Sequence, residues 1–251
     1  MTFVSKKGLI LFLTVFSTAL ISVIGCGSDK SPTKDNETYS FTITFGSSSI
    51  EIDAGELTRH TIDGVEGVLL SDIADTFILT EPQNHAYRLI GDDGFYAHIK
   101  GNPDNTCEHI QSGYFILSTM RIFFDPVLEL PGRYNIKNAV EMKILRKIDI
   151  ITPADSLVQF IIEEMTTTAF DDSLTAVKLT EFITPDITDN PSAYSYELIA
   201  NDDYTRTISF DQFREGYYVI EYDRVLYSIA DISSELKIKQ LNRITVLTPE
   251  E

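Results

Sequence analysis

The chain is poor in cysteine, tryptophan and basic residues. Its 251 residues include two cysteines and no tryptophan, and 20 lysines and arginines stand against 38 aspartates and glutamates, for a formal net charge of −18 at pH 7. Because phosphate binding requires a basic surface, we expect no nucleic acid among its partners. The same surface would be repelled by anionic lipid headgroups. An acidic surplus of this kind is typical of a well-solvated surface.

The sequence also lacks the common catalytic motifs. It contains no Gly-x-Ser-x-Gly nucleophile motif, no glycine-rich phosphate-binding loop and no His-Glu-x-x-His helix. His60, His85 and His98 follow none of the spacings used by metal ligands. Cys107 and His109 lie two residues apart, but a zinc site usually needs three or four protein ligands and a catalytic thiol needs an activating base. We therefore expect no catalytic residue and no metal ligand, and we assign no cofactor-binding residue.

Two acidic clusters could bind calcium through hard oxygen ligands. They are Asp92-Asp93-Gly94 and Asn201-Asp202-Asp203. Neither fits the alternating Asp-x-Asp-x-Asp-Gly loop with its distal glutamate, and Asn102 and Asp104 do not restore that spacing. Turn formation explains both clusters without a ligand, and calcium binding is the open alternative.

The start of the chain is typical of an export signal. Lys6 and Lys7 precede an uncharged, largely apolar run at 8–24, which ends in Val23-Ile24-Gly25-Cys26. A basic segment, an apolar core and a small residue before the cut are the marks of such a signal. The last four residues resemble the lipobox of bacterial lipoproteins, in which the cysteine thiol takes a diacylglycerol and the new amino terminus is acylated. The resemblance implies that residues 1–25 are removed, that Cys26 is lipidated, and that acyl chains such as palmitate attach the protein to a membrane.

A retained single-pass anchor is the alternative for this segment. Its 17 residues lie at the lower limit for crossing a hydrocarbon core of about 30 Å. A retained helix, however, gives no reason for a small residue followed by a cysteine. Gly27, and no aspartate, follows the cysteine, so the usual inner-membrane retention signal is absent and we expect outer-membrane placement in a cell that has one. With Cys26 lipidated, Cys107 is the only thiol left, which excludes an intramolecular disulfide.

Residues 26–39 are polar and have no apolar period, which predicts a flexible tether. The folded part then begins with alternating apolar residues at 41–45. Turn residues at 46–49 separate this run from Ile50-Glu51-Ile52, so we expect a β-hairpin.

Much of the remaining sequence occurs twice. Val68–Ile73 parallels Val177–Phe182, and Tyr87–Phe95 parallels Tyr196–Tyr204, both with a shift of 109 positions. The segments at 113–117 and 140–145 match those at 216–220 and 242–247 with shifts of 103 and 102. We therefore expect two tandem modules, at residues 40–149 and 150–251.

Each repeat predicts one short helix and several strands. Ser71 or Thr180 could cap the helix. In the first repeat, a strand around Tyr87 ends at the acidic turn, a strand rich in aromatic and branched residues covers 114–120, and a last strand covers 142–145. The fold class expected is α+β, mostly β.

Aromatic residues are concentrated in the expected strands. On a strand they are first of all core and cross-strand packing, although an exposed subset could bind a protein or a flat ligand. The residues concerned are Tyr114, Phe115, Phe123, Phe124, Tyr217, Tyr218, Tyr222 and Tyr227.

The order of motifs resembles the oxidoreductase molybdopterin-binding domain, which is the fold of the sulfite oxidase catalytic region. That family has a Gly-Val-x-Leu-x-Asp-Leu helix start, an Asp-Gly-Tyr strand end and a late Pro-Gly before a lysine-containing strand. This chain has Gly67–Ile73, then Asp93-Gly94-Phe95, then Leu130–Tyr134 leading into Ile136–Val140. The resemblance covers residues 67–145 and implies two sulfite-oxidase-like modules, the second more degenerate.

Departures from that family decide the expected function. The family ligates molybdenum with a cysteine ahead of the helix-start motif, yet no cysteine lies between Gly27 and Val68, and Cys107 does not occupy that position. Phosphate and pterin would also require arginines, and the arginines of the first module up to Leu145 match no motif of the family. They are Arg59, Arg88, Arg121 and Arg133.

We therefore expect a lipid-anchored cell-envelope protein that acts as a binding or accessory module without a cofactor. Its partners would be the membrane, reached through the lipid, and an envelope protein, with the cleft between the modules as the contact surface. The alternative is an oxidoreductase that retains a molybdopterin cofactor without the usual cysteine ligand. A purely structural or solute-capturing lipoprotein is a third possibility.

Overall fold

The computed structural model describes residues 38–62, 64–79, 81–97, 104–171, 173–228 and 237–248. The chain divides into Met1–Asn36 and the compact unit Glu37–Glu251. The expected signal, Cys26 and almost all of the expected tether lie outside the described residues. Within the described ranges, no helix is both long enough and apolar enough to cross a bilayer.

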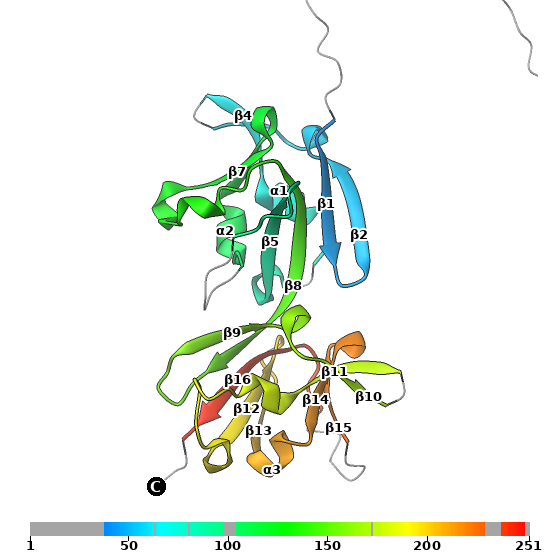
Figure 1. Cartoon of the computed structure of the whole chain (residues 1–251), viewed down its shortest axis with the longest axis vertical. Coiled ribbons are helices and arrows are strands. Elements are labelled where there is room, and N and C mark those ends of the chain that lie inside the picture. Colours follow the sequence, from blue (N-terminus) through cyan, green and yellow to red (C-terminus); the bar gives the residue numbers. More distant parts are fainter. Residues whose placement is uncertain are drawn as a thin grey trace, which may run out of the picture. The chain divides into compact units, whose positions relative to one another are not determined.

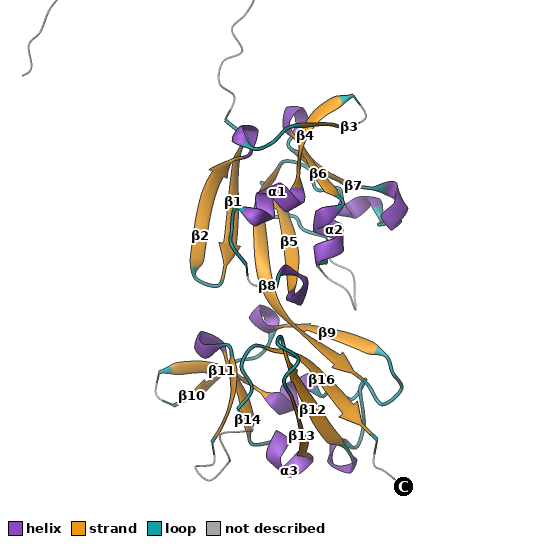
Figure 2. Cartoon of the chain, turned by 180° about the vertical axis from the view of Figure 1, so that it is seen from behind, coloured by secondary structure: helices purple, strands orange, loops and turns teal. Residues whose placement is uncertain are grey.

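The fold is α+β and mostly β, as the sequence predicts (Figures 1 and 2). The strands of the first half are β1 (Ser40–Phe45), β2 (Ser48–Asp53), β3 (His60–Ile62), β4 (Val65–Leu69), β5 (His85–Gly91), β6 (Gly113–Ile116), β7 (Arg121–Phe124) and β8 (Ala139–Ile151). Those of the second half are β9 (Leu157–Ile161), β10 (Thr168–Phe170), β11 (Leu174–Lys178), β12 (Ser195–Ala200), β13 (Thr205–Ser209), β14 (Gly216–Val219), β15 (Arg224–Tyr227) and β16 (Leu241–Leu247). The α-helices are α1 (Leu70–Asp75), α2 (Cys107–Gln111) and α3 (Phe210–Phe213), and short 3₁₀ turns make up the remaining helical segments.

Strand β8 is shared by the two halves of the fold. The largest sheet has the order β13-β12-β16-β8-β1-β2, and β5 and β9 also pair with β8. In Figure 1, β8 runs as one continuous green strand from the first set of strands into the second. The module boundary expected between residues 149 and 150 falls within this strand, two residues before its end at Ile151.

Most of the elements occur twice along the chain in the same order, although β13 has no counterpart among the described residues of the first half and a 3₁₀ turn replaces α1 in the second. β4 begins at Val65 and β11 at Leu174, 109 positions later, whereas β6 and β14 begin at Gly113 and Gly216, 103 positions apart. Each half has its own four-stranded sheet, β3-β4-β6-β7 in the first and β10-β11-β14-β15 in the second. β1 pairs in parallel with β8 in the first half, as β8 itself pairs in parallel with β16 in the second.

Two hydrophobic clusters fill the halves. Phe41 and Phe115 pack edge to face at 5.4 Å in the first, and Tyr196 and Phe213 stack at 4.0 Å in the second. Alternation along the strands explains this burial, because successive side chains point to opposite faces of a sheet. In β1, for example, Phe41 and Ile43 are fully buried, and their neighbours are more exposed.

Two local expectations are wrong. Ser71 and Thr180 cap no helix: β4 continues to Leu69, α1 begins at Leu70 without a side-chain cap, and the equivalent 3₁₀ turn Leu179–Phe182 also lacks one. The aromatic-rich strand expected at 114–120 ends at Ile116, where a 3₁₀ turn begins.

Candidate functional site

The sheet β3-β4-β6-β7 has a buried face and an outer face. Phe115 and Ile122 are fully buried, and the residues that alternate with them point outward. On this outer face Tyr114 lies opposite Phe123, and Ile116 lies opposite Arg121. The strand register therefore places two aromatic side chains and one arginine on the same surface.

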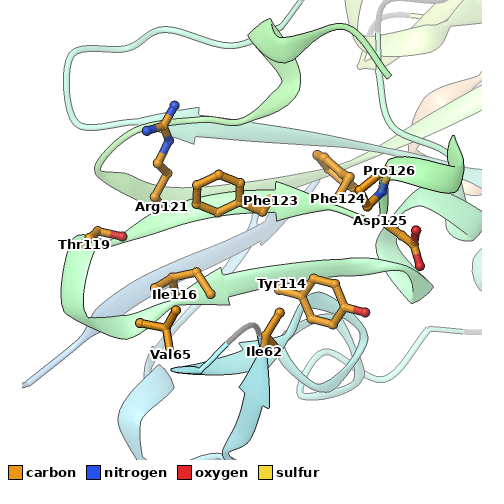
Figure 3. Close-up of a pocket in the computed structure, with 10 residues that line it drawn as sticks. All are labelled: Ile62, Val65, Tyr114, Ile116, Thr119, Arg121, Phe123, Phe124, Asp125 and Pro126. Carbon is orange, nitrogen blue, oxygen red and sulfur yellow. The ribbon is translucent and has the colours of Figure 1, made fainter. Parts of the chain in front are cut away.

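A hollow of about 580 Å³ lies on this outer face (Figure 3). This volume falls within the range of about 300–1,000 Å³ that is usual for small-molecule sites. Its apolar lining consists of Ile62, Val65, Tyr114, Ile116, Phe123 and Phe124, and Thr119, Arg121, Asp125 and Pro126 border it. The β3–β4 hairpin contributes Ile62 and Val65, and β6 and β7 contribute the floor.

Few polar groups face the hollow. The Arg121 guanidinium lies 4.9 Å from the centre of the Phe123 ring, and its buried Nε has no hydrogen-bond partner within the described ranges. At the other end of β7, Asp125 Oδ1 accepts a hydrogen bond of 2.9 Å from the Val127 backbone N–H. An apolar surface with a few convergent polar groups is the usual character of a binding site.

The hollow also exposes apolar side chains to solvent. Val65, which lines it, is 41% exposed, and Tyr114 and Phe123 are half-buried. Contiguous apolar surface of this kind marks interaction sites more often than scattered single residues do.

Cys107 and His109 both belong to the first turn of α2. Burial raises the pKa of the Cys107 thiol, and the charge of Asp75 adds to this effect, so the thiol stays protonated at neutral pH. His109 Nδ1 accepts from the Thr106 backbone N–H at 3.3 Å, and the Thr106 hydroxyl accepts from the His109 N–H in return. This is a capping box. His109 therefore helps to begin α2, and Cys107 is the first residue of that helix.

The other histidines are separate from one another. His60 Nε2 lies 3.6 Å from the Asp72 carboxylate, which is beyond hydrogen-bond distance. His85 Nδ1 is 3.2 Å from the Glu81 carbonyl, and burial lowers the pKa of this imidazole. His98 lies outside the described residues. Nowhere in the part of the chain that the structure describes do three or more His, Cys, Asp or Glu side chains come together as a metal site.

Both acidic clusters act as turns. Asp93 Oδ1 accepts from the Phe95 N–H at 2.9 Å, and Asp202 Oδ1 accepts from the Tyr204 N–H at 3.2 Å. These are the local hydrogen bonds that favour aspartate in turns. Asp104 is buried and binds Arg88 at 2.7 Å, and Asn102 lies outside the described ranges.

The structure divides the eight aromatic residues into three groups. Phe115, Phe124, Tyr218 and Tyr227 are buried, Tyr114, Phe123 and Tyr217 are half-buried, and Tyr222 is 59% exposed. Aromatic composition alone could not separate the core residues from those on the outer face, because strand register decides which face each residue takes.

The described residues supply no thiolate ligand where the molybdopterin-binding family has one. Cys107 is the first residue of α2 and does not lie ahead of the Gly67–Ile73 motif in the sequence. Arg59 and Arg88 already bind Glu66 at 3.1 Å and Asp104 at 2.7 Å. We therefore derive no chemistry through this cofactor.

No family model, no curated protein and no solved structure matches this chain. Arg121 is not among the site residues expected from the sequence, although the repeat contains one signal for it. Arg224 occupies the equivalent position of the second repeat, at the same shift of 103 positions that relates Tyr114 to Tyr217.

Proposed function

We propose that this protein is a lipid-anchored protein of the cell envelope that acts by binding, and that its ligand enters the hollow above β6 and β7. The observation that carries the proposal is the partly exposed apolar surface of Tyr114, Phe123 and Val65 around a hollow of ligand size. Covering apolar surface yields about 25 cal/mol per Å², so an apolar ligand gains affinity here without any catalytic group.

The anchor is proposed from the sequence alone. Val23–Cys26 follows a basic and then an apolar segment, and a Cys26 lipid would account for membrane attachment of an acidic protein. Expression of Cys26→Ser in a bacterial host tests this. The wild-type protein should fractionate with membranes and carry acyl chains by mass spectrometry. A wild-type protein without acyl chains would refute the anchor.

Binding is tested with a neutral apolar dye, N-phenyl-1-naphthylamine, titrated into the chain without residues 1–26. We expect saturable fluorescence enhancement, weakened at least about fivefold by Phe123→Ala, because truncation of a central aromatic contact typically costs over 1 kcal/mol. Phe95→Ala is the matched control, since Phe95 is 49% exposed and does not line the hollow. Equal affinity of Phe123→Ala and wild type would refute the site.

We also propose that both modules are degenerate relatives of the oxidoreductase molybdopterin-binding domain. The supporting motifs lie at junctions of the fold: Gly67–Ile73 joins β4 to α1, Asp93-Gly94 forms the turn after β5, and Pro131-Gly132 begins a 3₁₀ turn before β8. Protein purified from its native host should contain no molybdenum above background. A stoichiometric molybdenum signal would instead support the oxidoreductase alternative.

A further inference from the structure

Three residues of the β6–β7 region are identical at the equivalent positions of β14–β15. The pairs are Gly113/Gly216, Tyr114/Tyr217 and Arg121/Arg224. Packing explains the glycines, because a Cβ at Gly113 would lie 2.5 Å from Leu70 Cδ1 and one at Gly216 would lie 2.6 Å from Leu179 Cδ1. The tyrosines and arginines are half-buried, so core packing does not explain why both repeats keep them.

The two pairs occupy the same place on their sheets. In the first half Tyr114 lies opposite Phe123 and Arg121 opposite Ile116. In the second half Tyr217 lies opposite Leu226 and Arg224 opposite Val219. Each sheet thus presents a tyrosine and an arginine as diagonal neighbours on one face, with apolar residues across from both.

Among the described residues, neither arginine side chain has a hydrogen bond or an ion pair, although the Arg121 guanidinium lies over the Phe123 ring. The Nε of Arg121 and that of Arg224 are buried. Arg88 and Arg146, by contrast, bind Asp104 at 2.7 Å and Glu163 at 2.8 Å. A buried donor without a partner destabilises a fold by about 1–3 kcal/mol. Both repeats have an arginine with such an unpaired donor at the equivalent position, which indicates that a bound group accepts a hydrogen bond from each arginine.

The surroundings limit what that group can be. In the first half, one cation over the Phe123 ring matches one anion attached to an apolar body. In the second half, Lys239 pairs with Arg224 in an isolated β-bridge and adds a second positive charge that favours an anion. Phe170 packs against Tyr217 at 5.3 Å and extends the apolar surface of the second face, as Ile62 and Val65 do for the first. The net charge of −18 disfavours a ligand with several negative charges.

We propose that each half of the fold binds one small monoanionic amphiphile, with the apolar body on Tyr114 or Tyr217 and the anion on Arg121 or Arg224. This inference rests on the binding function proposed above. It adds that the ligand carries a negative charge and that the second half of the fold has a site of its own. The protein would therefore take up two equivalents of ligand.

The test compares two dyes that differ in charge. The anionic probe is 8-anilinonaphthalene-1-sulfonate, and the neutral one is N-phenyl-1-naphthylamine, both titrated into the chain without residues 1–26. We expect two equivalents of the anionic dye for the wild type. Arg121→Met and Arg224→Met should each weaken one of the two sites about tenfold, and the double variant should weaken both.

Controls separate charge from folding. Arg121→Lys and Arg224→Lys keep the charge and should bind the anionic dye within a few fold of wild type. Arg214→Met removes an exposed arginine of the surface after α3 and should have no effect. Binding of the neutral dye should not change in any arginine variant.

Each outcome has a definite consequence. Suppose that the neutral dye binds at the hollow and that the methionine variants bind the anionic dye like wild type. The prediction of an anionic ligand is then refuted, and the proposed binding function stands. A stoichiometry of one, or insensitivity to Arg224→Met alone, refutes the second site. Failure of both dyes to bind refutes both proposals. Sedimentation equilibrium could instead show a dimer that Arg121→Met dissociates. The outer face of β6 and β7 would then bind a second copy of the chain, and the proposal of an amphiphilic ligand would be refuted.

Discussion

Two tyrosines make the same hydrogen bond in the two repeats. The Tyr87 hydroxyl donates to the Pro82 carbonyl at 2.9 Å, and the Tyr196 hydroxyl donates to the Pro191 carbonyl at 2.8 Å. Both rings are almost fully buried, and both prolines begin a 3₁₀ turn just before the strand. The bond therefore attaches each turn to the core of its own half.

Tyr87→Phe and Tyr196→Phe should each lower the free energy of unfolding by about 1 kcal/mol, because each leaves a carbonyl without its donor. Urea denaturation followed by circular dichroism measures this loss. Tyr222→Phe is the control, since Tyr222 is 59% exposed and should change stability by less than about 0.5 kcal/mol. Equal stabilities for all three variants would contradict this role for the hydroxyls.

Tyr227 is a buried tyrosine whose hydroxyl has no hydrogen-bond partner among the residues that the structure describes. Phe124 occupies the equivalent position of the first repeat, which shows that a ring without the hydroxyl fits this site of the fold. Tyr227→Phe should therefore raise the free energy of unfolding by about 1 kcal/mol, since it removes the cost of a desolvated hydroxyl. Urea unfolding at neutral pH measures the change, and a loss of stability would contradict it.

The same residue predicts a dependence on pH. Burial raises the pKa of Tyr227 to about 12 from its usual 10.0, as it does that of Tyr196. Between pH 10 and 12 the unfolded chain loses protons that the folded chain keeps, so stability is full below pH 10 and falls as the pH rises. Tyr227→Phe should make this decline shallower. An unchanged slope would show that the tyrosine titrates freely in the folded state.

Glycines at the start of β6 and β14 let these strands approach the segments that follow β4 and β11. A Cβ at Gly113 would meet Leu70 and Phe124, and one at Gly216 would meet Leu179, all at under 3 Å for the nearest atoms. Gly113→Ala and Gly216→Ala should each destabilise the protein by about 1–3 kcal/mol through overpacking. Thermal unfolding measures the effect.

Gly132 provides the matched control for these variants. In the described part of the chain, no heavy atom lies within 4 Å of its ideal Cβ position, and its φ is not positive. Gly132→Ala should therefore be neutral or slightly stabilising. Destabilisation of Gly132→Ala as large as that of Gly113→Ala would contradict the packing explanation.

The strands were more predictable from the sequence than the helix starts. The hairpin of β1 and β2 follows from alternation and turn residues at 46–49, which are local signals. The expectation that Ser71 caps a helix is wrong because β4 extends to Leu69 and α1 begins directly after it. Pairing with β6 determines where β4 ends. Pairing between distant segments cannot be read from local sequence.

The hollow could not be predicted from the sequence, because pairing between strands brings its lining residues together. Tyr114 and Phe123 were recognised as candidate binding residues, but only the register of β6 and β7 places them opposite each other. Ile62 and Val65 come from a short hairpin that the sequence did not suggest. Arg121 could have been found by comparing the repeats, because it is identical to Arg224 at a position outside the core.

Sharing of β8 couples the two halves of the folded chain. This strand pairs with β1 and β5 in the first half and with β9 and β16 in the second. Unfolding either half would remove partners from the same 13-residue strand. We therefore expect the two halves to unfold together.

Ile73→Val tests this coupling, because Ile73 is fully buried in the first cluster and the substitution should cost about 0.5–1.5 kcal/mol. Amide hydrogen exchange by mass spectrometry should become faster in β12 as well as in β5. Ile244→Val, in the second cluster, is the reciprocal variant and should affect both strands similarly. Faster exchange confined to the mutated half would show that the halves unfold independently.

The most direct test of the account is a map of ligand contacts on the whole folded chain. Backbone amide NMR of the chain without residues 1–26, titrated with N-phenyl-1-naphthylamine, provides it. We expect saturable shift changes concentrated in β3, β4, β6 and β7 around Tyr114 and Phe123. Shift changes that avoid these strands, or no saturable change at all, would contradict a binding function located in the hollow.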